Sequence, residues 1–148
     1  MAGTVIPSVR AAIVDLLGPL VSPVPVSYGH PGDLGQTAHV WLGSARNVGS
    51  ESTQDVASMR ASRNRRRETI STELVIEVTS EPTARKAEAK AAEIGTVFEE
   101  MVADDDTLGG VENLLFSIIT DVELDTTETG TGARSVMTFT LTAVGDLL

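Results

Sequence analysis

The sequence predicts an α+β fold, in which a mixed or antiparallel sheet of about four to five strands carries one long helix and a short N-terminal helix. Two patterns lead to this prediction. Residues 65–80 alternate apolar and polar side chains, as a strand with one buried face does. Residues 83–103 repeat apolar side chains at intervals of three and four, as an amphipathic helix does. The length of 148 residues suits one domain, so we expect residues 1–148 to form a single domain.

The chain begins with a short helix and two short strands. Residues 7–17 start with a proline, place apolar residues at helical spacing and precede a Gly-Pro pair, which indicates that the helix stops there. Residues 24–29 and 37–43 are β-rich and bounded by Pro and Gly, so they predict two strands. Trp41 alternates with the apolar residues of its strand and so faces opposite to the strand's core side. Its role is either that of a core residue or that of an interface anchor.

Residues 44–66 lack a sustained apolar period and are rich in Ser, Asn and Gly, which predicts a long loop or mobile arm. Five of the nine arginines lie at its end: Arg60, Arg63, Arg65, Arg66 and Arg67. On an acidic chain this cluster indicates contact with an acidic partner or a neighbouring copy. Local ion pairs with the protein's own acids, or a phosphate contact, are the alternatives.

The second half of the chain predicts a helix followed by a hairpin. The helical stripe consists of Ala87, Ala91, Ile94, Phe98 and Met101. Residues 113–125 and 134–144 predict two strands joined by a hairpin loop. In the first of these strands, four apolar residues are expected to share the buried face: Phe116, Ile118, Val122 and Leu124. We expect the helix to pack on the sheet face that bears Ile70, Leu74, Ile76, Phe116, Ile118, Phe139 and Leu141.

Composition excludes several classes of function. The absence of cysteine removes disulfide scaffolds and thiol chemistry, and no apolar run is long enough to span a bilayer. A net charge of −10 with 3% aromatic residues argues against a general nucleic-acid binder. We expect His30 and His39 to be surface residues. No motif for a nucleophile, a metal or a cofactor is supported, so we expect no catalytic residue, no metal and no cofactor.

The predicted elements resemble those of a known protein family in order and length, over nearly the whole chain. The portions that carry it are PSVRAAIVDLL, VPVSYG, TAHVWLG, the arm ending RNRRRETISTELVIEV, the helix PTARKAEAKAAEIGTVFEEMV, and LLFSIITDVELDTTETGTGARSVMTFTLTAV. In this arrangement the chain resembles the tail terminator proteins of long-tailed (siphovirus) bacteriophages.

The resemblance implies a structural virion protein without catalytic activity. Its subunits would form a hexameric ring on the finished tail tube, stop tube polymerisation and offer their other face to the head-completion or stopper protein. The partners are then copies of the chain, the tail tube protein and the stopper protein, with DNA as a passing cargo and no membrane. Its location would be the host cytoplasm during assembly and then the tail end of the virion neck. Another phage neck or head-closure protein, an acidic protein-binding module and a small cofactor-free hydrolase are the alternatives.

Overall fold

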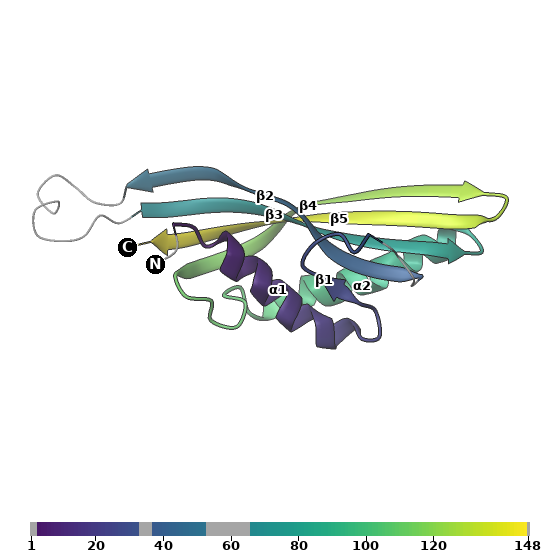
Figure 1. Cartoon of the computed structure of the whole chain (residues 1–148), viewed down its shortest axis with the longest axis horizontal. Helices are drawn as coiled ribbons and strands as arrows, with labels where there is room; N and C mark the ends of the chain where they lie inside the picture. The colour runs from purple at the N-terminus through teal and green to yellow at the C-terminus, as the bar shows by residue number, and fades with distance from the viewer. Residues whose placement is uncertain (1–2, 33–36, 53–65, 148) are drawn as a thin grey trace, which may run out of the picture.

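The computed structural model describes residues 3–32, 37–52 and 66–147. They form two layers, with a long twisted sheet on one side and both helices against one of its faces (Figure 1). The helices are α1 (Ile6–Val21) and α2 (Ala84–Asp104), and the strands are β1 (Val26–Ser27), β2 (Ala38–Ser52), β3 (Arg66–Glu81), β4 (Leu114–Thr129) and β5 (Gly132–Leu147). The strand order is β1-β2-β3-β5-β4; β1 runs parallel to β2 and every other pair is antiparallel. The α+β class and the five-stranded mixed sheet confirm the sequence prediction.

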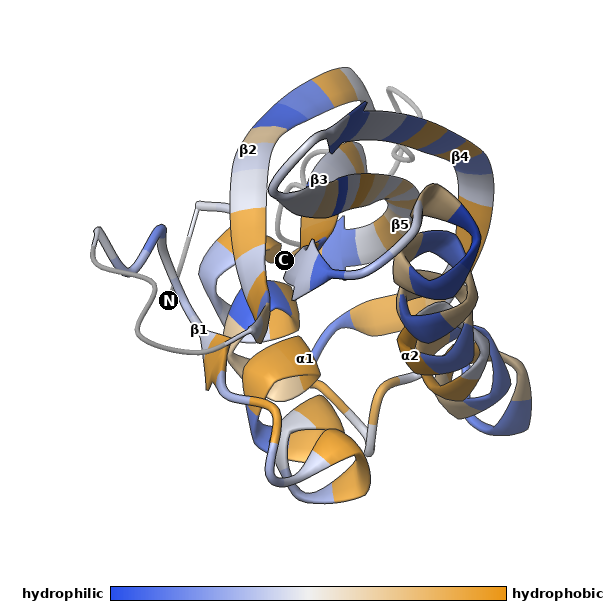
Figure 2. Ribbon diagram, turned by 90° about the vertical axis from the view of Figure 1, so that its right-hand side faces the viewer, coloured by the Kyte–Doolittle hydropathy of each residue, from blue (hydrophilic) through white to orange (hydrophobic). Residues whose placement is uncertain are grey.

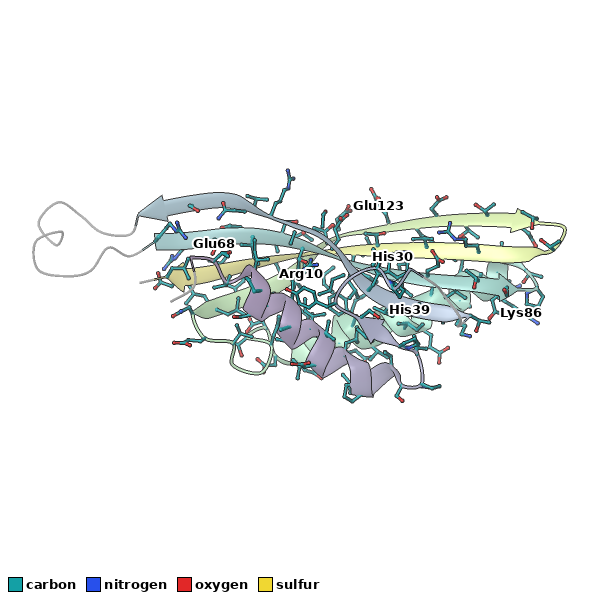
Figure 3. All side chains as sticks on the ribbon, viewed as in Figure 1. Arg10, His30, His39, Glu68, Lys86 and Glu123 are labelled. Carbon is teal, nitrogen blue, oxygen red and sulfur yellow. The ribbon has the colours of Figure 1, made fainter. Side chains whose placement is uncertain are left out.

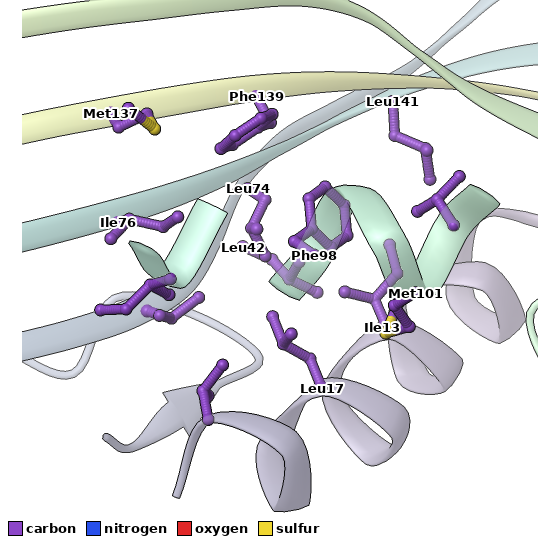
Figure 4. Packing of buried hydrophobic residues seen from close by; sticks show 14 of the residues in the cluster. Ile13, Leu17, Leu42, Leu74, Ile76, Phe98, Met101, Met137, Phe139 and Leu141 are labelled. Atoms are coloured by element: carbon purple, nitrogen blue, oxygen red, sulfur yellow. The ribbon is translucent and has the colours of Figure 1, made fainter. Parts of the chain in front are cut away.

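The helix α2 follows its sequence pattern closely. It begins after Thr83, whose hydroxyl accepts a hydrogen bond from the Lys86 N–H at 3.2 Å. Its buried residues are Ala87, Ala91, Ile94, Gly95, Phe98, Met101 and Val102. The Phe98 ring is fully buried and meets the Phe139 ring edge to face, with 5.5 Å between ring centroids (Figure 4). The predicted contact stripe is therefore confirmed.

Gly95 allows α2 to approach β5 closely, because a Cβ at this position would lie 2.8 Å from Phe139 Cζ and 3.0 Å from Met137 Sδ. We expect Gly95→Ala to lower the free energy of unfolding by about 1–3 kcal/mol, since the steric cost exceeds the gain in helix propensity. Chemical denaturation measures the change. Gly18→Ala in α1 is the matched control, because nothing lies within 4 Å of the Cβ it would add. If both substitutions stabilise the protein, α2 does not pack this tightly on β5.

The helix α1 is longer than the sequence predicts. It continues through Gly18 and Pro19 to Val21, so the expected stop at residue 17 is wrong. Pro19 lies in the last turn, where it removes a single intrahelical hydrogen bond, and the extra turn buries Val21 against the core. Figure 2 colours most of α1 as hydrophobic, in keeping with its position under the sheet. With 16 residues, α1 is not a short helix.

A buried carboxylate of β3 anchors the start of α1. Glu68 is 1% exposed and accepts hydrogen bonds from the Val5 backbone N–H at 3.1 Å and from Asn47 Nδ2 at 3.2 Å. The Thr4 hydroxyl donates to the same carboxylate. A negative charge next to the first turn of a helix is stabilising, because the unpaired N–H groups there carry partial positive charge. Figure 3 shows Glu68 where β3 meets the beginning of α1.

The strands differ in length from the predicted ones. Residues 44–52, predicted as part of an arm, belong to β2 and pair with β3, for example Arg46 with Ser71. Two register shifts in this part of β2 interrupt the alternation of side chains, which is why the sequence shows no period there. The strand predicted at 24–29 contains only Val26–Ser27, while the predicted hairpin loop shrinks to residues 130–131 between β4 and β5.

The four apolar residues of β4 do not share a buried face, so this prediction is wrong. Phe116 pairs with Val144 and Ile118 with Thr142, on the sheet face away from the helices. A register shift between Ile119 and Asp121 then turns Val122 towards the helix side. The extra residue of a β-bulge inverts the alternation, and alternation alone cannot reveal it. The exposed fractions are 44% for Phe116, 53% for Ile118, 46% for Val122 and 45% for Leu124.

Candidate assembly surfaces

The face of the sheet away from the helices carries a gradient of charge. The register aligns residues in rows across the four long strands, and one such row is Trp41, Val75, Thr138 and Glu123. Among the described side chains of the four long strands, the register places six carboxylates on this face: Glu73, Glu77, Asp121, Glu123, Asp125 and Asp146. Figure 3 shows Glu123 on the side of β4 opposite to the helices. Three of the six lie on β4, so the largest group of acids on this face is at one edge of the sheet.

Positive charge lies at the other side of the same face. Arg46 of β2 is exposed and shares a row with Ser71, Thr142 and Ile118. Arg67 of β3 is also exposed and pairs with Asp146 of β5. One face of one subunit therefore presents Arg46 and Arg67 at one end, with Asp146 beside Arg67, and three acids on the β4 edge, with Arg134 of β5 nearby. Such a surface favours contacts between copies in which unlike ends meet.

The arginine cluster predicted from the sequence is described only in part. Arg60, Arg63 and Arg65 lie outside the described residues. Arg66 is the first residue of β3 and donates a hydrogen bond to the Gly3 carbonyl, which ties the strand to the N-terminal segment. Arg67 follows it on the exposed face. Arg46, which sequence reasoning did not single out, lies at the same end of the sheet because β2 continues where a loop was expected.

Trp41 lies on the face away from the core, as its alternation predicts, but another segment of the same chain covers it. Its exposed fraction is 9%, and the His30 ring packs edge to face on the indole with 4.7 Å between centroids. Little of the indole is thus left for contact with another molecule in this conformation. Figure 3 shows His30 and His39 near one another over this part of β2.

His39 is buried, so its predicted place on the surface is wrong. Its Nε2 atom lies 3.0 Å from the Ser27 hydroxyl, and its Nδ1 atom has no hydrogen-bond partner among the described residues. Burial lowers the pKa of His39, with a smaller contribution from His30, while Glu77 opposes the shift. Glu77 is itself buried and accepts a hydrogen bond from Arg134 at 2.5 Å. Burial thus favours the neutral form of the imidazole, while the Ser27–His39 and Arg134–Glu77 contacts link β1 to β2 and β5 to β3.

The edge strand β4 gathers exposed apolar side chains. Of the eight large hydrophobic residues that are exposed in the described chain, five lie on β4: Leu115, Phe116, Ile118, Val122 and Leu124. Beside them runs an open groove of about 620 Å³ between β4 and the end of α2, lined by residues that include Val102, Ile119 and Val122. Neighbouring apolar groups on a strand edge mark a contact site more often than a lone exposed leucine does.

Within residues 3–32, 37–52 and 66–147, no group of three or more His, Cys, Asp or Glu side chains could hold a metal ion. None of the helices in this part of the chain is both long and apolar enough to cross a bilayer.

Comparison with known proteins finds a solved structure with a similar fold. Neither a family model nor a curated protein matches the sequence. A solved structure described as "Virion of native gene transfer agent (GTA) particle" contains a chain of similar fold, with a TM-score of 0.53 and 16% sequence identity. The match covers 98% of this chain and 99% of that chain. The protein therefore has the fold of a chain that forms part of a gene transfer agent virion.

Proposed function

We propose that the protein is a structural component of a phage-like virion and acts there as a tail terminator. The observation that carries the proposal is the end-to-end likeness to a chain of a virion particle, in which almost every residue of both chains takes part. The order of elements seen in the sequence supports the same assignment. In this role the chain works through surfaces and needs no catalytic group, cofactor or metal.

The charged surfaces suit a ring of identical subunits. A heterologous contact between unlike ends either closes into a ring or extends into a filament, and a terminator must close. We propose a ring of six that caps the tail tube, stops its polymerisation and binds the stopper protein on its other side. The ring forms in the host cytoplasm and remains in the virion neck.

The acidic part of the sheet face suits a channel through which DNA passes. If Asp121, Glu123 and Asp125 face the lumen, their negative charge repels the phosphate backbone, so the DNA slides without being held. The membrane has no part in this proposal.

The proposal predicts a closed ring. We expect native mass spectrometry of the protein, alone and mixed with tail tube protein, to detect a species of about six subunits, because heterologous contacts saturate only on closure. Negative-stain images of the same samples should show rings. A persistent monomer or a two-fold dimer under both conditions contradicts the terminator role. Rings that bind a head-completion protein but no tube protein favour a head-closure protein, and a monomer that binds basic proteins favours an acidic binding module.

A further inference from the structure

The sheet has two long unpaired edges among the described residues. On one side, β4 pairs only with β5 along its 16 residues. On the other side, β1 pairs with β2 only at Val40 and Trp41, so β2 has no outer neighbour from Gly43 to Ser52. Figure 1 shows β2 and β4 on opposite sides of β3 and β5.

The direction of the strands makes the two edges compatible. The pairs β2–β3, β3–β5 and β5–β4 are all antiparallel, so β2 and β4 run in opposite directions. If two copies stand side by side in the same orientation, β4 of one copy meets β2 of the next as an antiparallel neighbour. This is the pairing that continues the existing pattern of the sheet without a break.

The strand β4 lacks most of the features that prevent edge pairing. Its sequence contains no Lys, Arg or Pro, although soluble proteins commonly place such residues on exposed edges. It exposes five large apolar side chains instead. Its protections of this kind are four acidic side chains and two register shifts, and the shifts leave the stretch from Asp121 to Thr129 in regular register with β5.

Charge selects which edge of a second copy fits. Two β4 strands related by a two-fold axis near Glu123 would bring the carboxylates of Asp121, Glu123 and Asp125 near those of the other copy, which is repulsive. The β2 edge carries Arg46 and the half-exposed Val48, and its one acid, Glu51, pairs in register with Arg67 of β3. It therefore offers a positive charge to the acids of β4 and an apolar side chain to its apolar residues.

We infer that the β4 edge binds the β2 edge of a second copy of this chain, residues 43–52, as an antiparallel strand. The contact is heterologous and leaves one β2 edge and one β4 edge unpaired at the ends of any open oligomer. The inference rests on the proposed ring only for closure, since the pairing itself follows from the edges.

Thiol cross-linking tests the pairing, because the chain has no cysteine of its own. We prepare the single variants Ile118→Cys on β4 and Val48→Cys on β2, both at exposed positions, and treat them with a short bis-maleimide. An equal mixture should give a covalent dimer, each variant alone should remain monomeric on a denaturing gel, and the double variant should give a ladder. Leu20→Cys in α1, 57% exposed, is the matched control and should not cross-link with either.

The outcomes separate this inference from the proposed function. Cross-linking of Ile118→Cys alone shows a two-fold β4 contact and overturns the inference. Rings in native mass spectrometry without cross-links in the mixture also overturn it, while the ring proposal stands. Monomers in both experiments overturn both.

A charged substitution on the β4 edge provides a second test of the contact. We expect Ile118→Lys to raise the protein concentration needed for half-assembly by about tenfold or more, since it places a solvated charge in the strand contact. Leu20→Lys, which makes the same change on α1, should leave that concentration unchanged. Equal assembly of both variants contradicts the edge contact.

Discussion

Replacing Phe98 with alanine is expected to lower the free energy of unfolding by about 3–5 kcal/mol. The ring has no exposed surface and lies in the centre of the contact between α2 and the sheet, against Phe139 (Figure 4). Its removal loses buried apolar surface, the edge-to-face contact and the atoms that fill the space between the two layers. Urea denaturation followed by circular dichroism measures the loss.

The neighbouring exposed position provides the control for this prediction. Glu99→Ala lies on the solvent side of the same turn and should change stability by no more than about 0.5 kcal/mol. A loss below about 1 kcal/mol for Phe98→Ala would mean that the helix presents another face to the sheet.

Reversal of Arg63 and Arg65 to glutamate is expected to abolish ring assembly while the subunit stays folded. The two residues belong to the predicted arginine cluster, which continues into the exposed Arg67 at the basic end of the sheet. Arginine–carboxylate contacts strengthen when an interface partly excludes water, and reversal replaces attraction by repulsion. Native mass spectrometry measures assembly, and the midpoint of chemical denaturation shows whether the subunit is folded.

A matched reversal elsewhere separates position from net charge. Arg85→Glu with Lys86→Glu makes the same change in total charge at the exposed start of α2, and this variant should still assemble. If the Arg63 and Arg65 variant forms normal rings at physiological salt, the cluster does not take part in assembly.

Most of the layered fold could be predicted because it depends on local periodicity. In α2, Ala87, Phe98 and Met101 recur at the helical interval, and in β3, Ile70 and Leu74 alternate with polar neighbours. Both elements pack against the core along their whole length, so burial leaves a regular mark on the sequence. The α+β class follows from these two elements alone.

The assembly surfaces could be predicted only in part, because they depend on register and on distant contacts. The bulge between Ile119 and Asp121 reverses which side chains of β4 point towards the helices, and no residue type in the sequence indicates where it lies. His39 is polar in the sequence and becomes buried because a segment around Ser27 covers it. Residues 44–52 lack alternation because two register shifts interrupt it, so their place at a sheet edge is seen only from the pairing with β3.

The unpaired edge of β4 also sets which molecules it rejects. About half of its backbone N–H and C=O groups point away from β5, and water satisfies them in the isolated subunit. A partner that covers this edge with hydrocarbon strips off that water and leaves buried amides unbonded, at about 1–3 kcal/mol for each group. A partner that brings its own row of amides replaces the lost water bonds one for one. The same strand therefore exposes both apolar side chains and unpaired backbone groups, and the cost of dehydrating these groups discriminates against smooth apolar surfaces.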